Sequence, residues 1–149
     1  MKRIAVISLA LVALYFGYKR LTGDSPDATY VRFAEEMLQR HYDKAAALSQ
    51  GLSADDLAKL GTQERIGPGP AMFSVLFASR FNVDSRETAA DGSTVLHATQ
   101  IVLFNPNGIE SAVPAMKAVM KQVVTLRKSE GAWKVTAFEN AFESMGSFR

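Results

Sequence analysis

Residues 119–142 read VMKQVVTLRKSEGAWKVTAFENAF, and this stretch decides the fold class. It consists of two runs rich in Val, Thr and aromatic residues around a polar turn at Ser129, Glu130 and Gly131. Such runs favour β-strands, and a short polar segment containing glycine is typical of the turn between two antiparallel strands. The stretch therefore predicts a β-hairpin.

A second hairpin is expected upstream, from FNVDSRET (81–88) and STVLHATQIVLF (93–104), with Asp91 and Gly92 at the positive-φ positions of the turn. NPNG at 105–108 predicts another turn. ESAVPAMK at 110–117 fits a loop, a helical turn or an edge strand with Pro114 at a bulge. For AMFSVLFASRF at 71–81, after the turn GPGP at 67–70, we expect a helix starting near Pro70, with a buried strand as the alternative, because short apolar runs are ambiguous.

The first half of the sequence has helical periodicity. Ser25 or Asp24 is the expected N-cap, with Pro26 in the first turn. Gly51 is the expected stop of a second, alanine-rich segment, and Ser53 is the expected cap of a short helix ending at Gly61. Apolar and aromatic residues recur three and four positions apart along the first helix: Tyr30, Phe33, Ala34, Met37, Leu38, His41 and Tyr42. Helices followed by antiparallel strands predict an α+β domain.

The net charge of +2 comes from the N-terminus. Four basic residues, Lys2, Arg3, Lys19 and Arg20, flank the apolar run IAVISLALVALYFGY at 4–18. The rest of the chain has 13 basic against 15 acidic residues and is mildly acidic. A polyanion-binding surface is therefore not indicated, and we expect no nucleic-acid partner.

The apolar run is about 22 Å long as a helix, shorter than the ~30 Å hydrocarbon core of a membrane. It ends in Tyr15, Phe16, Gly17 and Tyr18 without the small residues of a cleavage site, which favours an uncleaved signal anchor over a removed signal peptide. Lys19 and Arg20 can snorkel, so residues 4–21 form the expected buried length. We expect an anchor at 1–22, a linker at 23–26 and a domain at 27–149. The predicted location is the bacterial inner membrane, crossed once, with the C-terminal domain in the periplasm.

Motifs of common enzyme classes are missing from the sequence. There is no cysteine, which excludes disulfides and thiolate chemistry. There is no phosphate-binding loop, no dinucleotide fingerprint, no zinc-protease motif and no hydrolase elbow. We therefore expect neither a metal nor a cofactor.

The terminal strand, Gly131 to Asn140 (GAWKVTAFEN), resembles that of the nuclear transport factor two-like superfamily, and within it the SnoaL-like and SgcJ/EcaC-like domains. The resemblance covers most of residues 27–143. It implies a cone of about three helices packed on a curved antiparallel sheet, with a pocket at the open end and dimerisation through the outer sheet face. Because this superfamily contains isomerases, cyclases, dehydratases and binding modules, the resemblance does not select a function.

Two polar residues are candidates for catalysis. Enzymes of the superfamily place acidic and histidine side chains inside the pocket, so His97 is a candidate base, although an ordinary strand histidine is the alternative. Asn140 is a candidate polarising group, with a hydrogen bond to a loop as the alternative. The parity of Asp84 is ambiguous, and only an inward side chain would suit acid–base chemistry. Candidates for lining a pocket for a small hydrophobic ligand, or else the core, are Tyr30, Phe73, Phe77, Phe104 and Phe138.

Three functions remain open: a membrane-anchored, periplasm-facing module that binds a small molecule or a protein, a small-molecule isomerase, cyclase or dehydratase, and a scaffold subunit of an envelope assembly. We expect a binding module rather than an enzyme. Alternation places Phe138, Asn140 and Phe142 on one face of the last strand, with Trp133 and Val135 on the other. Because both faces are apolar, we expect a homodimer through the sheet.

Overall fold

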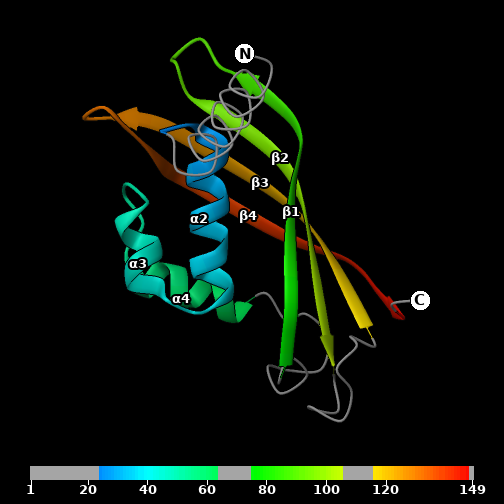
Figure 1. The fold of residues 1–149 in the computed structure, drawn as a ribbon. Coiled ribbons are helices and arrows are strands. Elements are labelled where there is room, and N and C mark those ends of the chain that lie inside the picture. Colours follow the sequence, from blue (N-terminus) through cyan, green and yellow to red (C-terminus); the bar gives the residue numbers. More distant parts are fainter. Residues whose placement is uncertain (1–23, 64–74, 106–115, 148–149) are drawn as a thin grey trace, which may run out of the picture.

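The computed structural model describes residues 24–63, 75–105 and 116–147, and in them three helices precede four strands (Figure 1). The α+β class expected from the sequence is confirmed. The proposed anchor, the turns at 67–70 and 106–108, Phe73 and Pro114 lie outside the described residues. The elements are α2 (Pro26–Leu38), α3 (Tyr42–Ala47), α4 (Ala54–Gln63), β1 (Val75–Thr88), β2 (Thr94–Asn105), β3 (Met116–Ser129) and β4 (Ala132–Ser147).

The four strands form one antiparallel sheet in the order β1-β2-β3-β4. Both predicted hairpin turns are confirmed, but Asp91, expected at a positive-φ position of the first turn, does not have a positive φ. Gly92 has φ +81° in the first turn, and Glu130 and Gly131 have φ 51° and 85° in the second. Two successive positive φ values suit the right-handed twist of the strands that the second turn joins.

The helix expected over residues 71–81 is wrong from Val75 onward, because β1 begins there. Val75 pairs with Asn105 and Phe81 pairs with Gln100, so the run finds backbone partners along β2. The local apolar pattern did not distinguish a helix from a strand, and pairing with β2 stabilises the strand. The strand alternative is the one observed.

Helix α2 begins as predicted, with the Ser25 side chain accepting a hydrogen bond from the Ala28 amide and with Pro26 in the first turn. It ends at Leu38, earlier than the apolar stripe suggests, because Arg40 adopts φ 60°. The next helix, α3, ends at Ala47 rather than at Gly51. The Ser53 cap of α4 is confirmed, since its hydroxyl accepts from the Asp56 amide at 3.1 Å.

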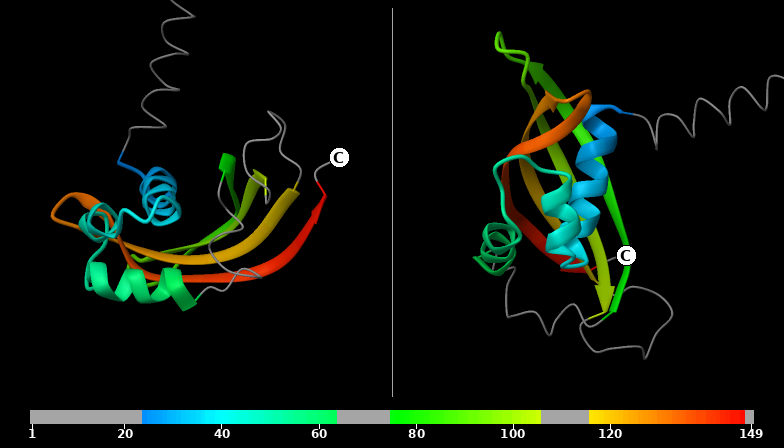
Figure 2. Two further views of the ribbon diagram at one scale, coloured as in Figure 1. Left: turned by 90° about the horizontal axis from the view of Figure 1, so that it is seen from below. Right: turned by 90° about the vertical axis from the view of Figure 1, so that its left-hand side faces the viewer.

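The sheet is strongly curved, and α2 lies on its concave side (Figure 2). Three side chains from α2, Tyr30, Phe33 and Ala34, enter the core with at most 2% exposure. Phe33 packs edge-on against Phe138 with ring centroids 5.2 Å apart. Burying a phenylalanine of this kind contributes about 2–3 kcal/mol, so α2 is held mainly by its apolar stripe.

The end of α3 is attached to the outer edge of β4. The Val135 amide donates to the Leu48 carbonyl at 3.0 Å, and the Gln50 amide donates to the Val135 carbonyl at 2.8 Å. Lys134 Nζ also donates to the Ala47 carbonyl at 2.6 Å. These bonds cover the first part of an otherwise open strand edge.

A β-bulge changes the faces of β4. Leu126 pairs with Val135 and Thr125 with Ala137, which leaves Thr136 as an extra residue. Val135 therefore lies in the same core cluster as Phe138, and Trp133 packs against that cluster. The expectation that Trp133 and Val135 face away from Phe138 is wrong, because the extra residue Thr136 shifts the alternation of faces by one position.

Candidate functional site

The convex face of the sheet is formed by side chains that alternate with the buried ones. Strand β2 contributes Val95, His97, Thr99 and Ile101, and β3 contributes Val119, Lys121, Val123 and Thr125. Their aliphatic members are only half-buried. All three helices contribute to the core cluster on the other side, through residues such as Phe33, Ala45 and Leu57, so this face is a candidate binding surface.

A polar cluster crosses the convex face at its centre. Asp84 accepts hydrogen bonds from the Thr99 hydroxyl at 2.6 Å and from Asn82 Nδ2 at 2.7 Å. Lys121 Nζ donates to Thr99 Oγ1 at 2.6 Å and lies 3.4 Å from Asp84 Oδ2. The Thr99 hydroxyl, followed by the Asn82 amide and the Lys121 charge, lowers the pKa of Asp84.

Asp84 faces outward because of a second bulge. Val83 pairs with Ala98 and Ser85 pairs with His97, so Asp84 has no direct partner on β2. Asp84 therefore does not face inward, as a catalytic acid or base in a pocket would have to. Instead the carboxylate belongs to an exposed surface.

His97 also lies on the convex face, on the same side as Val95, Thr99 and Ile101, as alternation predicts. Its Nε2 is 3.7 Å from Glu87 Oε1, and 44% of its side chain is exposed. Such a loose, solvent-exposed contact contributes little to stability. The arrangement is that of a surface histidine beside a carboxylate.

Asn140 lies on the opposite, concave face. It pairs with Gln122, and its Nδ2 is 3.6 Å from Met120 Sδ. His97 pairs with Val123, the next residue along β3, so the sheet separates His97 from Asn140. The two catalytic candidates therefore do not converge on one substrate position.

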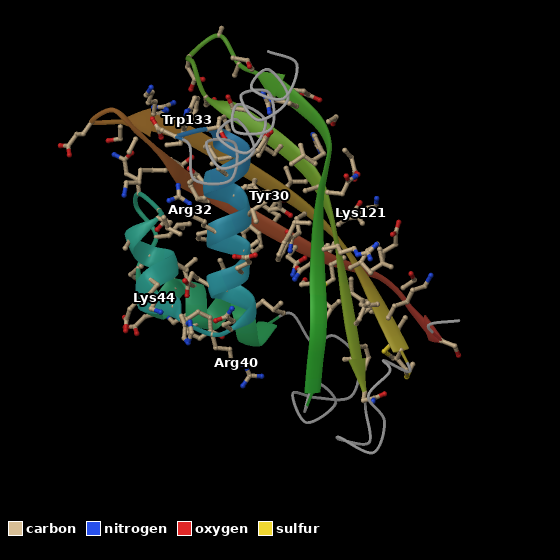
Figure 3. All side chains as sticks on the ribbon, viewed as in Figure 1. Tyr30, Arg32, Arg40, Lys44, Lys121 and Trp133 are labelled. Carbon is tan, nitrogen blue, oxygen red and sulfur yellow. The ribbon has the colours of Figure 1, made fainter. Side chains whose placement is uncertain are left out.

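A row of uncharged polar side chains crosses the concave face beneath α2. Tyr30 projects from α2 toward the sheet (Figure 3) and donates to Gln122 Oε1 at 2.6 Å. Gln122 Nε2 donates to Gln100 Oε1 at 2.6 Å, and Gln100 Nε2 donates to Ser79 Oγ at 3.1 Å. The bonds run in one direction from helix to edge strand, an order that strengthens each of them.

Burial, with a smaller contribution from the charge of Asp84, raises the pKa of Tyr30 far above the ordinary phenol value. The hydroxyl therefore keeps its proton and acts as the donor to Gln122. Because the members of the row satisfy one another, the row serves the core more directly than it serves a ligand.

The pocket-lining candidates fall into the core where the structure describes them. Tyr30 and Phe104 are fully buried, and Phe138 is 7% exposed. Phe77 is placed only by its position in β1, and Phe73 lies outside the described residues.

His41, the other histidine, is not in the helix stripe. It lies in the turn before α3, where its Nδ1 is 2.8 Å from Glu36 Oε2. Among the described residues, no three metal-ligating side chains gather.

The residues that sequence reasoning missed are Lys121 on the convex face and the two glutamines of the concave row. A signal for the glutamines was present, since each interrupts the apolar parity of its strand. No signal in the sequence linked Gln122 to Tyr30, because the two residues are 92 positions apart.

No family model matches the sequence, and no curated protein is significantly similar to it. Within the described residues no helix is long and apolar enough to cross a membrane.

Proposed function

We propose that this chain is a binding module, tethered to the bacterial inner membrane by residues 4–21, whose periplasmic domain docks a protein partner on the convex face of its sheet. The observation that carries the proposal is the half-buried aliphatic surface of Val95, Ile101, Val119 and Val123, which α2 leaves uncovered. Apolar side chains that stay partly accessible on a sheet face are a surface on which a partner can dock. The order of helices before a four-stranded meander supports membership of the nuclear transport factor two-like superfamily as part of the same proposal.

The test is site-specific crosslinking in intact membranes. A photo-reactive residue is introduced at Val119 on the convex face and, as a matched control, at Glu35 on the exposed side of α2. The proposal expects protein adducts from Val119 and none from Glu35. Equal labelling from both positions, or no adduct from Val119, would overturn it.

The same experiment separates two kinds of binding module. A scaffold subunit of an envelope assembly gives a large heteromeric adduct from Val119, whereas a lone receptor gives a single defined species. The isomerase alternative receives no support from the described residues, because His97 and Asp84 lie on one face of the sheet and Asn140 on the other.

A small hydrophobic ligand is a second candidate, favoured by one observation on the concave face. Phe142 is 46% exposed there, opposite Met120 and two residues from Asn140. An exposed ring beside a carboxamide suits an apolar ligand that carries one polar group. Titration with a fluorescent apolar probe tests this: we expect saturable binding that Phe142→Ser abolishes and Tyr42→Phe retains, and unsaturable binding in both variants would dismiss it.

A further inference from the structure

Strand β1 forms one edge of the sheet, and its outer side has no backbone partner among the described residues. Its register with β2 is unbroken from Ala78 to Val83, between bulges at Phe77 and Asp84. In an antiparallel pair alternate residues bond to the neighbouring strand, so about half of the amides and carbonyls in this run point away from β2. No hydrogen bond of the described residues reaches them from the outer side. Such an edge is a template for an added strand.

The two edges of the sheet differ in how they are covered. On β4, Val135 exchanges backbone hydrogen bonds with Leu48 and Gln50. Helices α3 and α4 lie on that side of the molecule, away from β1 (Figure 1). Exposed edges are commonly protected by several charged residues or by proline, yet the run from Ala78 to Val83 has no proline and only one charged residue. This part of β1 is therefore open to pairing.

Apolar side chains lie beside the open edge on its concave side. Phe81 and Val83 are half-buried and pack against the core cluster. Val31 of α2 is also half-buried, and it lies one turn after Asp27, whose carboxylate binds Arg86 of β1. Val31 is therefore on the flank of α2 that faces β1. Because side chains alternate along a strand, every second residue of an added strand would point toward this apolar flank.

The convex side of the same edge presents a cation. Arg80 is exposed and alternates with the concave residues of the run. It forms no ion pair with the described residues, whereas Arg86 on the same strand is bound to Asp27. In an antiparallel pair, directly opposite Cβ atoms are about 5 Å apart. An acidic residue opposite Arg80 would therefore form an ion pair with it.

We propose that the open edge of β1 binds an extended segment of a protein partner as an added antiparallel strand, with apolar side chains toward α2 and an acidic side chain opposite Arg80. This edge site, Ala78–Val83 with the flank of α2, is separate from the convex face proposed above. Main-chain hydrogen bonds supply the affinity of such a site, and the alternating side chains supply its specificity. A second copy of the chain fits less well, because an antiparallel β1–β1 pair within this run places the two Arg80 side chains opposite or diagonal to each other.

The test measures binding of a labelled synthetic peptide to the full chain in mild detergent by fluorescence anisotropy. The peptide alternates valine with polar residues, and its central polar residue is glutamate. We expect saturable binding. Two further peptides carry N-methyl groups on alternate residues, so that each has lost the donors of one edge. Because only one edge of an added strand bonds to β1, one methylated peptide should bind like the original and the other should not bind.

Charge variants locate the peptide on β1. Arg80→Glu is expected to weaken binding roughly five- to tenfold, because an exposed ion pair is lost and a repulsion is gained. A peptide with lysine in place of glutamate should bind this variant as the original peptide binds the wild type, which also shows that the variant is folded. Arg32→Glu, on the exposed side of α2, is the matched charge control and should leave binding unchanged.

Three results would each overturn the proposal: no binding of the original peptide, equal binding of the two methylated peptides, or an Arg80→Glu variant that binds like the wild type. A dimer of the chain that the peptide dissociates, seen by sedimentation, would also overturn it, because a second copy would then occupy the edge. Absence of Val119 adducts in membranes would refute the proposed function and leave the edge site standing.

Discussion

The hydrogen bond between Tyr30 and Gln122 gives the sharpest quantitative prediction. Tyr30→Phe removes only the hydroxyl, so the ring keeps its edge-on contact with Phe81 at 6.0 Å. In the variant the Gln122 Oε1 acceptor loses its donor, the Tyr30 hydroxyl that lies 2.6 Å away in the wild type. Gln122 is only 2% exposed, so water does not replace that donor. An unsatisfied buried acceptor costs about 1–3 kcal/mol, a large part of the ~5–15 kcal/mol that stabilises a domain.

The companion variant Gln122→Leu is expected to cost more. It leaves both the Tyr30 hydroxyl and Gln100 Oε1 without their partners. In the double variant only the Gln100 acceptor is left, so the combined loss is expected to be smaller than the sum of the two single losses, by about 1 kcal/mol or more.

The assay is urea denaturation of the full chain in mild detergent at neutral pH, comparing free energies of unfolding at equal slope. Tyr42→Phe is the control, because the Tyr42 hydroxyl makes no hydrogen bond with the described residues. We expect that variant to change stability by less than about 0.5 kcal/mol. Additive single losses, or a Tyr30→Phe variant as stable as the Tyr42→Phe control, would refute the account of the concave row.

Three further predictions follow from the same structure. Because burial raises the pKa of Tyr30, its contribution is fully present below the ordinary phenol value of about 10 and is lost as pH rises beyond it; Tyr30→Phe should flatten the alkaline limb of stability measured by urea midpoints, and an unchanged limb would contradict this. Thr99→Val should raise the lowered pKa of Asp84 toward the ordinary value of about 3.9, because the Thr99 hydroxyl is the largest cause of the shift. NMR of the Asp84 carboxyl carbon measures this pKa. Because the pKa is lowered in the folded state, the ionised Asp84 stabilises the fold above the ordinary value, and this stabilisation is lost as pH falls through the folded pKa. Finally, the intact chain should remain in the membrane pellet after carbonate washing, and its recovery in the soluble fraction would refute the anchor.

The elements that could be predicted from the sequence are those with local signals. The start of α2 at Pro26 follows from its cap, and the two hairpin turns follow from Gly92 and Gly131, since glycine adopts a positive φ without steric cost. β1 was not predictable locally, because its strand state depends on pairing with β2. Long-range pairing of that kind leaves no periodicity of its own in a short apolar run.

The candidate site was less predictable than the fold, and bulges are the reason. The extra residue at Thr136 reverses the face assigned to Val135, and the extra residue at Asp84 turns a carboxylate outward. Alternation beyond a bulge is correct only if the bulge itself is recognised, and neither position carries a glycine that would mark it. In contrast, the faces of His97 on β2 and Asn140 on β4 follow from alternation within uninterrupted segments.

The central claim is that a protein partner covers the convex face while the chain is in its native membrane. The most direct measurement is the rate at which a water-soluble maleimide labels Ile101→Cys in intact membranes, compared with the same variant dispersed and diluted in mild detergent. Glu35→Cys serves as the reference for an uncovered site. The account predicts that Ile101→Cys is strongly protected in membranes and becomes reactive on dispersal, while Glu35→Cys reacts equally in both. An Ile101→Cys rate that is the same before and after dispersal would contradict it.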